Sequence, residues 1–405
     1  MRIKIINHKS GDLLPIIVDD DGLPIPSPNE FILSRRNLSA NTLLRNLREL
    51  AVFYKWLKIN QIDLELPFLL KSKNLFTEAE FKGGMIEFLR KDMVEVGTVV
   101  SPETFNNRLA TVRQYLVWRI DVSLSQLSFT DKQYELLETV KKRLLNWIDN
   151  SFINASKASG VLLKSLTDKE VEFLLQCLNP VISDSFGYFE PLKYRNFVIV
   201  MLMLNCGLRP GELLSLRVED IQIGAISSVT VRRRPLDPMD KRNPRPSIKR
   251  MGRILPLEGN NFLRILDKYI MEKREILQER SNRDTDYLVL SDEGEPLSHS
   301  SLTLFFTRLR KAYPDSLPSI LTPKSLRHTF SMRLERVLRE SGYEEERRRQ
   351  ALALLRGDTS LESQTVYIAQ EIEENARKAL ALYQKKIIGD SYEYQCNQST
   401  RKNNS

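Results

Sequence analysis

The sequence is poor in the residues that form disulfides and metal sites. Its 405 residues include only three cysteines, Cys177, Cys206 and Cys396, and none of them has CxxC or metal-ligand spacing. A sparse, odd set in a long chain is typical of free thiols in a reducing compartment. Histidine is equally rare, with three in the chain. A zinc site or a His-based triad is therefore not expected, and the chemistry must rest on other residues.

Long apolar runs are also absent. The longest unbroken run is Phe197 to Leu204, far below the roughly 20 residues that a membrane span needs. The first residues, MRIKIINHKSGD, lack the apolar core of a signal peptide. We therefore expect a cytoplasmic protein without a membrane partner.

Positive charge is concentrated in one segment. The formal net charge is +9, and such a balance favours polyanionic partners. Residues 231–253, here called the basic segment, hold nine Lys or Arg against two Asp and so contribute about +7. Most of the excess charge thus lies in one loop-like stretch.

The patterns predict a mainly α protein with a small β-hairpin (α+β) and two principal domains. Alternating short runs broken by turn residues indicate a β-rich lead-in, and a stretch rich in Ser and Asn indicates a linker. We predict a β-rich lead-in at 1–38, a helical domain at 39–148, a linker at 149–164, a second domain at 165–388 and a disordered tail at 389–405.

Four amphipathic helices are predicted in residues 39–148. Their start signals are Ser39, the capping box of Thr77 and Glu80, Ser101 followed by a proline, and Asp131. The third helix carries Arg108 and Arg113 off its apolar face. These arginines are either a solvated face or contacts to phosphate.

The second domain begins with a capping box at Thr167. A helix buried on all sides is predicted over 192–206, with Gly207 as its C-cap and Pro210 starting the next helix. Strands at 226–234 and 252–257 are predicted to form a β-hairpin around the basic segment. Further helices are predicted at about 259–280, 298–312, 324–341, 344–356 and 362–386.

Several positions in this domain are candidates for phosphate chemistry. The planar fork of Arg209 matches two phosphate oxygens, and Glu212 lies within one helical turn to support it; the alternative is a surface ion pair. Lys249 near the hairpin tip would protonate a leaving oxygen if Arg250 and Arg253 lower its pKa; the alternative is one more cation in a basic loop.

A second group of candidates follows near the C-terminus. Lys324 and Arg327 share one helix face and would clamp a phosphate, whereas His328 points elsewhere and is interpreted as a packed residue. Tyr367 would act as a nucleophile if cations lower its pKa, or it packs on an amphipathic helix.

The order of these motifs resembles the tyrosine recombinase (phage integrase) family. The sequence reads RPGE, then a hairpin lysine before RILPL, then TPKSLRHTF, and then a Gly-containing turn followed by a tyrosine. The resemblance covers most of the chain. It implies that residues 39–148 are a helical core-binding (SAM-like) domain and that residues 165–388 are a catalytic domain.

The resemblance assigns roles to individual residues. Arg209 and Arg327 match the two catalytic arginines, Lys249 the lysine that protonates the 5′-oxygen, and Tyr367 the nucleophile. Glu212 matches the acidic support. Lys324 stands where the family often has His, and Asp358 stands where it usually has His or Trp. The implied DNA contacts are Arg232, Arg233, Arg234, Arg250, Arg253, Arg108 and Arg113.

The implied function is site-specific cleavage and rejoining of duplex DNA through a 3′-phosphotyrosyl intermediate, for integration or excision of a mobile element. The reaction stores bond energy in the phosphotyrosine, so no metal, ATP or other cofactor is expected. A homotetramer on double-stranded DNA, accessory recombinases and a nucleoid location are implied as well. Asp358 and the missing histidine favour an alternative, a DNA-binding accessory protein that does not cleave. A relaxing topoisomerase is a third alternative.

Overall fold

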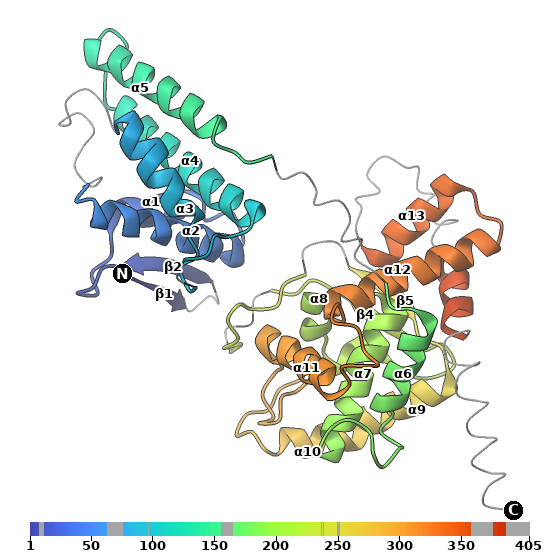
Figure 1. The fold of residues 1–405 in the computed structure, drawn as a ribbon. Helices are drawn as coiled ribbons and strands as arrows, with labels where there is room; N and C mark the ends of the chain where they lie inside the picture. The colour runs from blue at the N-terminus through green and yellow to red at the C-terminus, as the bar shows by residue number, and fades with distance from the viewer. Residues whose placement is uncertain are drawn as a thin grey trace, which may run out of the picture. The chain divides into compact units, whose positions relative to one another are not determined.

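The computed structural model describes residues 1–7, 12–62, 76–95, 97–154, 165–235, 237, 239–248, 252–357 and 376–385 (Figure 1). Two compact units are present. Unit 1 comprises Met1–Ser159 and Leu236–Met239, and unit 2 comprises Gly160–Pro235 and Asp240–Ser405. Among the described residues, no helix is both long and apolar enough to cross a membrane.

Unit 1 opens with the predicted β-hairpin. Strands β1 (Arg2–Asn7) and β2 (Leu13–Val18) pair antiparallel, which confirms the hairpin. Helix α1 (Pro26–Ser34) follows and was not predicted. The Asn29 side chain accepts from the Ile17 N–H and donates to the Ile17 carbonyl, both at 2.8 Å. The first 38 residues therefore share the hydrophobic core of unit 1.

The predicted start signals of unit 1 cap real helices. Ser39, Ser101 and Asp131 each accept a hydrogen bond from a backbone N–H of the first turn, and Thr77 and Glu80 exchange the two bonds of a capping box. The helices are α2 (Ala40–Ile59), a π-helical stretch (Glu80–Ile86) that runs into α3 (Glu87–Arg90), α4 (Pro102–Leu124) and α5 (Lys132–Asp149).

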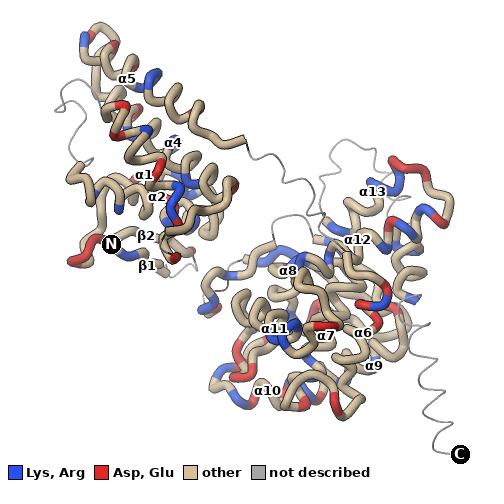
Figure 2. Tube along the Cα trace, viewed as in Figure 1, with Lys and Arg blue, Asp and Glu red and all other residues tan. Residues whose placement is uncertain are grey.

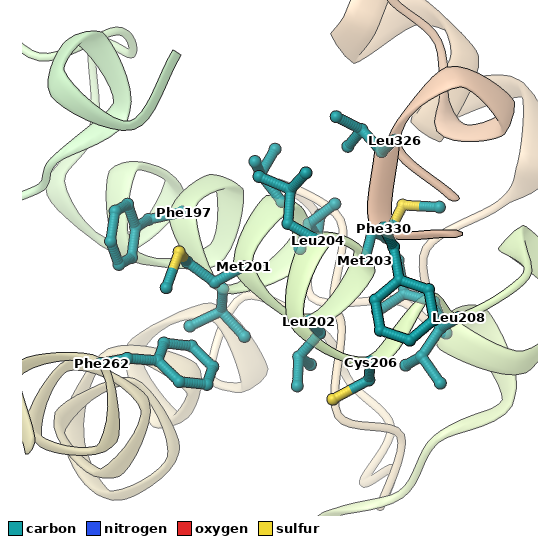
Figure 3. Packing of buried hydrophobic residues seen from close by; sticks show 14 of the residues in the cluster. Phe197, Met201, Leu202, Met203, Leu204, Cys206, Leu208, Phe262, Leu326 and Phe330 are labelled. Carbon is teal, nitrogen blue, oxygen red and sulfur yellow. The ribbon is translucent and has the colours of Figure 1, made fainter. Parts of the chain in front are cut away.

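Unit 2 is built around α7 (Glu190–Cys206), which is buried on all sides as the sequence predicts. Figure 3 shows Phe197, Met201 and Leu204 of α7 among side chains from other elements. Around it lie α6 (Asp168–Leu178), α8 (Pro210–Ser215), a 3₁₀ turn (Val218–Asp220), α9 (Asn260–Lys268), a π-helical stretch (Tyr269–Lys273), α10 (Arg274–Gln278), α11 (His299–Ala312), α12 (Pro323–Glu340) and α13 (Glu345–Arg356).

The predicted hairpin belongs to a three-stranded sheet. Strands β4 (Ser228–Val231) and β5 (Arg253–Pro256) pair antiparallel as predicted, and β3 (Ile221–Gln222) adds a third strand beside β4. A two-residue strand has no alternation to detect, so the sequence pattern does not show it.

A glycine turn connects α7 to α8. Gly207 has φ +58°, and a Cβ added there would lie 2.3 Å from the ring of Phe330 on α12. Figure 3 shows the Phe330 ring beside Cys206 and Leu208, on either side of this turn. Only glycine satisfies both the positive φ and the close approach. The turn therefore brings Arg209, the N-cap of α8, next to α12.

The last described helical residues, 376–385, pack against the core of unit 2. The Tyr383 hydroxyl donates to the Leu204 carbonyl at 2.9 Å, and the buried Gln384 side chain donates to the carbonyls of Asn205 and Pro256 at 3.0 and 3.1 Å. Of the helix predicted at 362–386, these residues are the described part. They join the chain beyond Tyr367 to the end of α7 and to β5.

Candidate functional site

A buried carboxylate organises the candidate site. Glu212, in the first turn of α8, has a side chain that is 2% exposed. It accepts a hydrogen bond from the backbone N–H of Arg209 at 2.9 Å, so the residue fixes the start of its own helix. An ionised carboxylate that is removed from water requires cationic partners.

Three arginines from three segments supply that charge. Arg209 Nη1 lies 2.9 Å from Glu212 Oε1, which confirms the predicted pair. Arg253 of β5 binds both carboxylate oxygens, with Nη1 3.1 Å from Oε1 and Nη2 3.0 Å from Oε2. Arg327 of α12 places Nη1 3.9 Å from Oε2. We call these four residues the arginine cluster. Three guanidinium groups and one carboxylate leave a formal charge of +2.

The C-terminal end of α13 closes the other side of the arginine cluster. Arg253 Nε donates to the Leu355 carbonyl at 2.7 Å, and Arg327 Nη2 donates to the Arg356 carbonyl at 2.9 Å. Arg209 reaches the carbonyls of Arg356 and Gly357 at the longer distance of 3.3 Å. The last carbonyls of a helix carry partial negative charge and lack intrahelical partners, so they suit guanidinium donors.

Exposure separates the three arginines. The Arg209 side chain is 26% exposed, whereas those of Arg253 and Arg327 are 8% and 9% exposed. Arg327 also donates to the Gly207 carbonyl at the α7–α8 turn. Arg209 is thus the member of the cluster that solvent and a ligand reach most readily.

The pKa of Glu212 lies below its ordinary value. Burial raises it, but the hydrogen bonds and charge of Arg253, followed by the backbone N–H and charge of Arg209, outweigh burial. Glu212 is therefore ionised at neutral pH, and its charge partly offsets the three cations.

Lys324 and His328 lie on α12 beside Arg327. Lys324 is exposed at the start of the helix and His328 is partly buried. Burial, reinforced by the positive charges of Arg356, Lys324 and Arg327, lowers the pKa of His328. His328, which the sequence predicts to be a packed residue, therefore lies close to the positive charges of the candidate site and is neutral at neutral pH.

Four predicted site residues, Lys249, Arg250, Asp358 and Tyr367, lie outside the described residues. The described residues reach to the residue before Lys249 and to the residue before Asp358. A Cβ added to Gly211 of α8 would lie 2.7 Å from the Ser247 carbonyl, so the segment leading to Lys249 crosses the start of α8. Gly357, next to Asp358, ends α13 with φ +63°.

The structure corrects the role predicted for Arg253. We expected a DNA contact on the basic segment, but the side chain is buried against Glu212 and Leu355. The reason is that Arg253 opens β5 and faces the start of α8, not the hairpin tip. Because Arg253 lies 41 residues from Glu212, local spacing does not predict this pair.

Three other described arginines of the basic segment form ion pairs within unit 2. Arg232 and Arg234 both bind the buried Asp220, and Arg242 binds Asp240. Arg233 is exposed. Figure 2 shows Lys and Arg in the chain beside α8 and along α12 and α13. The segment's charge is thus partly neutralised, and the exposed guanidinium groups remain candidates for phosphate contact.

Arg108 and Arg113, the predicted DNA contacts of unit 1, have partners within the protein. Arg108 Nη1 donates to the carbonyls of Leu89 and Lys91 at 2.8 Å. Arg113 forms a two-pronged pair with Asp149 of α5, at 2.8 and 3.2 Å. Both therefore join helices of unit 1, and DNA contact by either stays a prediction. No group of three or more potential metal-ligating residues is found among the described residues.

Comparison with known proteins shows which proteins this chain resembles. Residues 164–338 match the phage integrase family, a range that includes Arg209, Glu212, Arg253 and Arg327 and ends before Tyr367. The chain is 25% identical over 307 residues to tyrosine recombinase XerD of Listeria monocytogenes, covering 75% of this chain and 82% of that protein. It is 28% identical over 145 residues to tyrosine recombinase XerC of Oceanobacillus iheyensis.

That second match spans 36% of this chain and 41% of the XerC protein, so less than half of that relative is represented. Among solved structures, XerH site-specific recombinase bound to a difH substrate, in a pre-cleavage complex, superposes with a TM-score of 0.51 at 16% identity. The alignment covers 85% of this chain and 82% of XerH. The two proteins therefore share a fold.

Residues 164–338 are thus a phage integrase domain. Over most of its length the chain is similar to site-specific recombinases of the tyrosine recombinase family.

Proposed function

We propose that this protein cleaves and rejoins duplex DNA at a specific site through a 3′-phosphotyrosyl intermediate. The observation that carries the proposal is the arginine cluster, in which one buried carboxylate holds Arg209, Arg253 and Arg327 together from three segments. The cluster is positive, partly open at Arg209 and fixed in place by folded elements. Such preorganised charge suits a phosphate whose negative charge grows in the transition state.

The chemistry follows from the charges. A phosphodiester carries one negative charge, and the pentacoordinate transition state of its cleavage carries about two. The formal charge of +2 in the arginine cluster matches that transition state better than the ground state. Binding that strengthens toward the transition state lowers the barrier.

The remaining roles are part of the proposal. Tyr367 attacks the phosphorus, and its phenolic proton passes to solvent. Lys249 protonates the departing 5′-oxygen, and Lys324 assists at the phosphate. The 5′-hydroxyl of a partner strand then attacks the phosphotyrosine and returns a proton to Lys249. The tyrosine is released and takes up a proton from solvent. Every bond broken is replaced by another phosphoester, so no metal or nucleotide cofactor is needed.

The biological role is proposed as integration or excision of a mobile element. The substrate is double-stranded DNA, held by both units largely through its phosphates. Joining two sites calls for four active sites, hence a homotetramer on DNA, with accessory recombinases as further partners. Such a substrate would place the protein with the nucleoid in the cytoplasm.

A trapped covalent adduct tests this function. Nicked duplexes that carry a randomised central region lose a short 5′-hydroxyl fragment on cleavage, so religation stops and the adduct accumulates. We expect an SDS-resistant protein–DNA adduct with the wild type and none with Tyr367→Phe, while both bind DNA equally. Sequencing the trapped duplexes would give the target site. Adduct formation by Tyr367→Phe would overturn the assignment of the nucleophile.

A second candidate is a DNA-binding accessory protein that does not cleave. The observation that favours it is the engagement of Arg327, which is 9% exposed and donates to the carbonyls of Gly207 and Arg356. This candidate predicts tight, salt-sensitive DNA binding and no adduct with any duplex in the pool.

A further inference from the structure

Arg253 differs from the other arginines of the cluster in what it touches. Its guanidinium binds Glu212 through two nitrogens and the Leu355 carbonyl through the third. Each of the three guanidinium nitrogens thus has a partner within the protein, and the side chain is 8% exposed. The guanidinium of Arg209, by contrast, binds Glu212 through Nη1, and the Arg209 side chain is 26% exposed.

The bidentate pair with Arg253 fixes the orientation of the carboxylate. Two parallel N–H···O bonds hold both oxygens in the plane of the guanidinium. With both oxygens fixed, Oε1 is placed for Arg209 and Oε2 faces Arg327. Arg253 therefore acts on the two arginines through Glu212.

Arg253 also links the arginine cluster to the end of α13. Gly357 has φ +63°, and a Cβ there would lie 2.7 Å from Arg253 Nη1. Gly357, which ends α13, is thus packed directly on this guanidinium. One side chain joins the start of α8, strand β5 and the end of α13.

We propose that Arg253 is a positioning residue for DNA cleavage, which orients the Glu212 carboxylate and anchors the end of α13 so that Arg209 and Arg327 face the phosphate. The inference rests on the proposed function. Arg253 itself does not touch the substrate.

Among the described residues, the charged groups that face Glu212 are Arg209 from the start of α8, Arg253 from β5 and Arg327 from α12, and α13 contributes backbone carbonyls. Cys206 lies near Arg253, and burial raises the pKa of its thiol to about 12, so it stays neutral. Loss of Arg253 would leave Glu212 buried with less positive charge beside it. Its pKa would then rise, and the carboxylate would begin to protonate at a higher pH.

The test compares wild type, Arg253→Gln and Arg253→Lys in the full chain. On the trapped duplex we expect Arg253→Gln to form adduct about 100-fold more slowly, since small displacements of catalytic groups cost this much. Its DNA affinity should be unchanged. The rate of adduct formation by Arg253→Gln should fall further as the pH is lowered. Adding Glu212→Gln to this variant should remove that pH dependence. Arg253→Lys keeps the charge without the fork and should lie between.

A matched control is Arg195→Gln. Arg195 is also a buried arginine of unit 2, but it donates to Asn196 and the Leu290 carbonyl and has no contact with the arginine cluster. This variant measures how much the rate of adduct formation falls when any buried guanidinium of unit 2 is lost. It should show no new pH dependence.

A second readout needs no DNA. In protein labelled with ¹³C at glutamate carboxyls, the Glu212 signal is identified by its absence from Glu212→Gln. We expect it to titrate at a higher pH in Arg253→Gln than in wild type. Unchanged titration, or a rate loss equal at every pH, would overturn the role of Arg253. A shifted titration with no adduct from the wild type would overturn the proposed function and leave the electrostatic link intact.

Discussion

The arginine cluster of unit 2 and the Arg113–Asp149 pair of unit 1 are both arginine–carboxylate contacts, but they differ in burial. Glu212 is 2% exposed and Arg253 is 8% exposed. Asp149 is 51% exposed and Arg113 is 36% exposed. In water an ion pair gains little, whereas a buried charge depends on its partner. The charge of Glu212 therefore depends on its arginine partners, whereas that of Asp149 does not.

The largest effect should come from Glu212→Ala, which leaves three guanidinium groups without a buried counter-charge. Removing one partner of a buried pair costs about 3–5 kcal/mol. The same change at the exposed carboxylate, Asp149→Ala, should cost about 0–1 kcal/mol. Urea denaturation of both variants measures the difference. Equal costs would refute the contrast between the two regions.

Gly357→Ala should have the next largest effect. Gly357 and Gly342 both follow a helix with positive φ, at +63° and +80°. Alanine at either position costs about 1 kcal/mol of backbone strain. A Cβ at Gly342 meets nothing within 4 Å, but at Gly357 it meets Arg253.

We therefore expect Gly357→Ala to unfold more easily than Gly342→Ala and to slow adduct formation, because Arg253 must move. Thermal denaturation and the trapped-duplex assay measure the two effects. Equal melting temperatures and equal rates of adduct formation for the two alanine variants would show that the contact with Arg253 contributes nothing to stability or activity.

Acid should weaken the cluster in a defined direction. The pKa of Glu212 is lowered on folding from 4.5, since Arg253 and Arg209 outweigh the effect of burial. A carboxyl with a depressed folded pKa contributes stability above its unfolded pKa and loses it as the pH falls through the folded value. The advantage of wild type over Glu212→Gln should thus be full near neutral pH and shrink below about pH 4.5. Urea denaturation at a series of pH values measures this difference. A difference that grows as the pH falls would contradict the prediction.

The smallest effect should come from Arg113→Gln. An exposed pair contributes about 0–1 kcal/mol, so unit 1 should remain folded with little change. If Arg113 exchanges Asp149 for a phosphate on DNA, the slope of log affinity against log salt should decrease by about one. Fluorescence anisotropy at several salt concentrations measures this slope. An unchanged slope would leave Arg113 a purely structural role.

Local signals explain what the sequence alone predicts here. The Arg209–Glu212 pair follows from a three-residue spacing across a helix start, and the caps at Ser39 and Thr167 follow from their neighbours. Helix α1 was missed because Pro26 and Pro28 suggest a turn, although proline is accommodated in a first helical turn.

Contacts between distant segments explain what the sequence does not predict. Arg253 is 41 residues from Glu212, and a run of basic residues gives no sign of which one is buried. The same holds for the carbonyls of α13, since backbone acceptors have no sequence signature. Motif order identifies the members of the site, but only the folded chain shows how they are held.

Cleavage of a neutral substrate tests the central claim most directly. Once the target site is known, the scissile phosphate is replaced by a methylphosphonate, which lacks the negative charge that Arg209 would neutralise. We expect Arg209→Gln to be severely impaired on the phosphodiester and to approach wild-type adduct formation on the methylphosphonate. An equal defect on both substrates would show that the arginine cluster does not act by neutralising the phosphate, and would contradict the proposed function of the site.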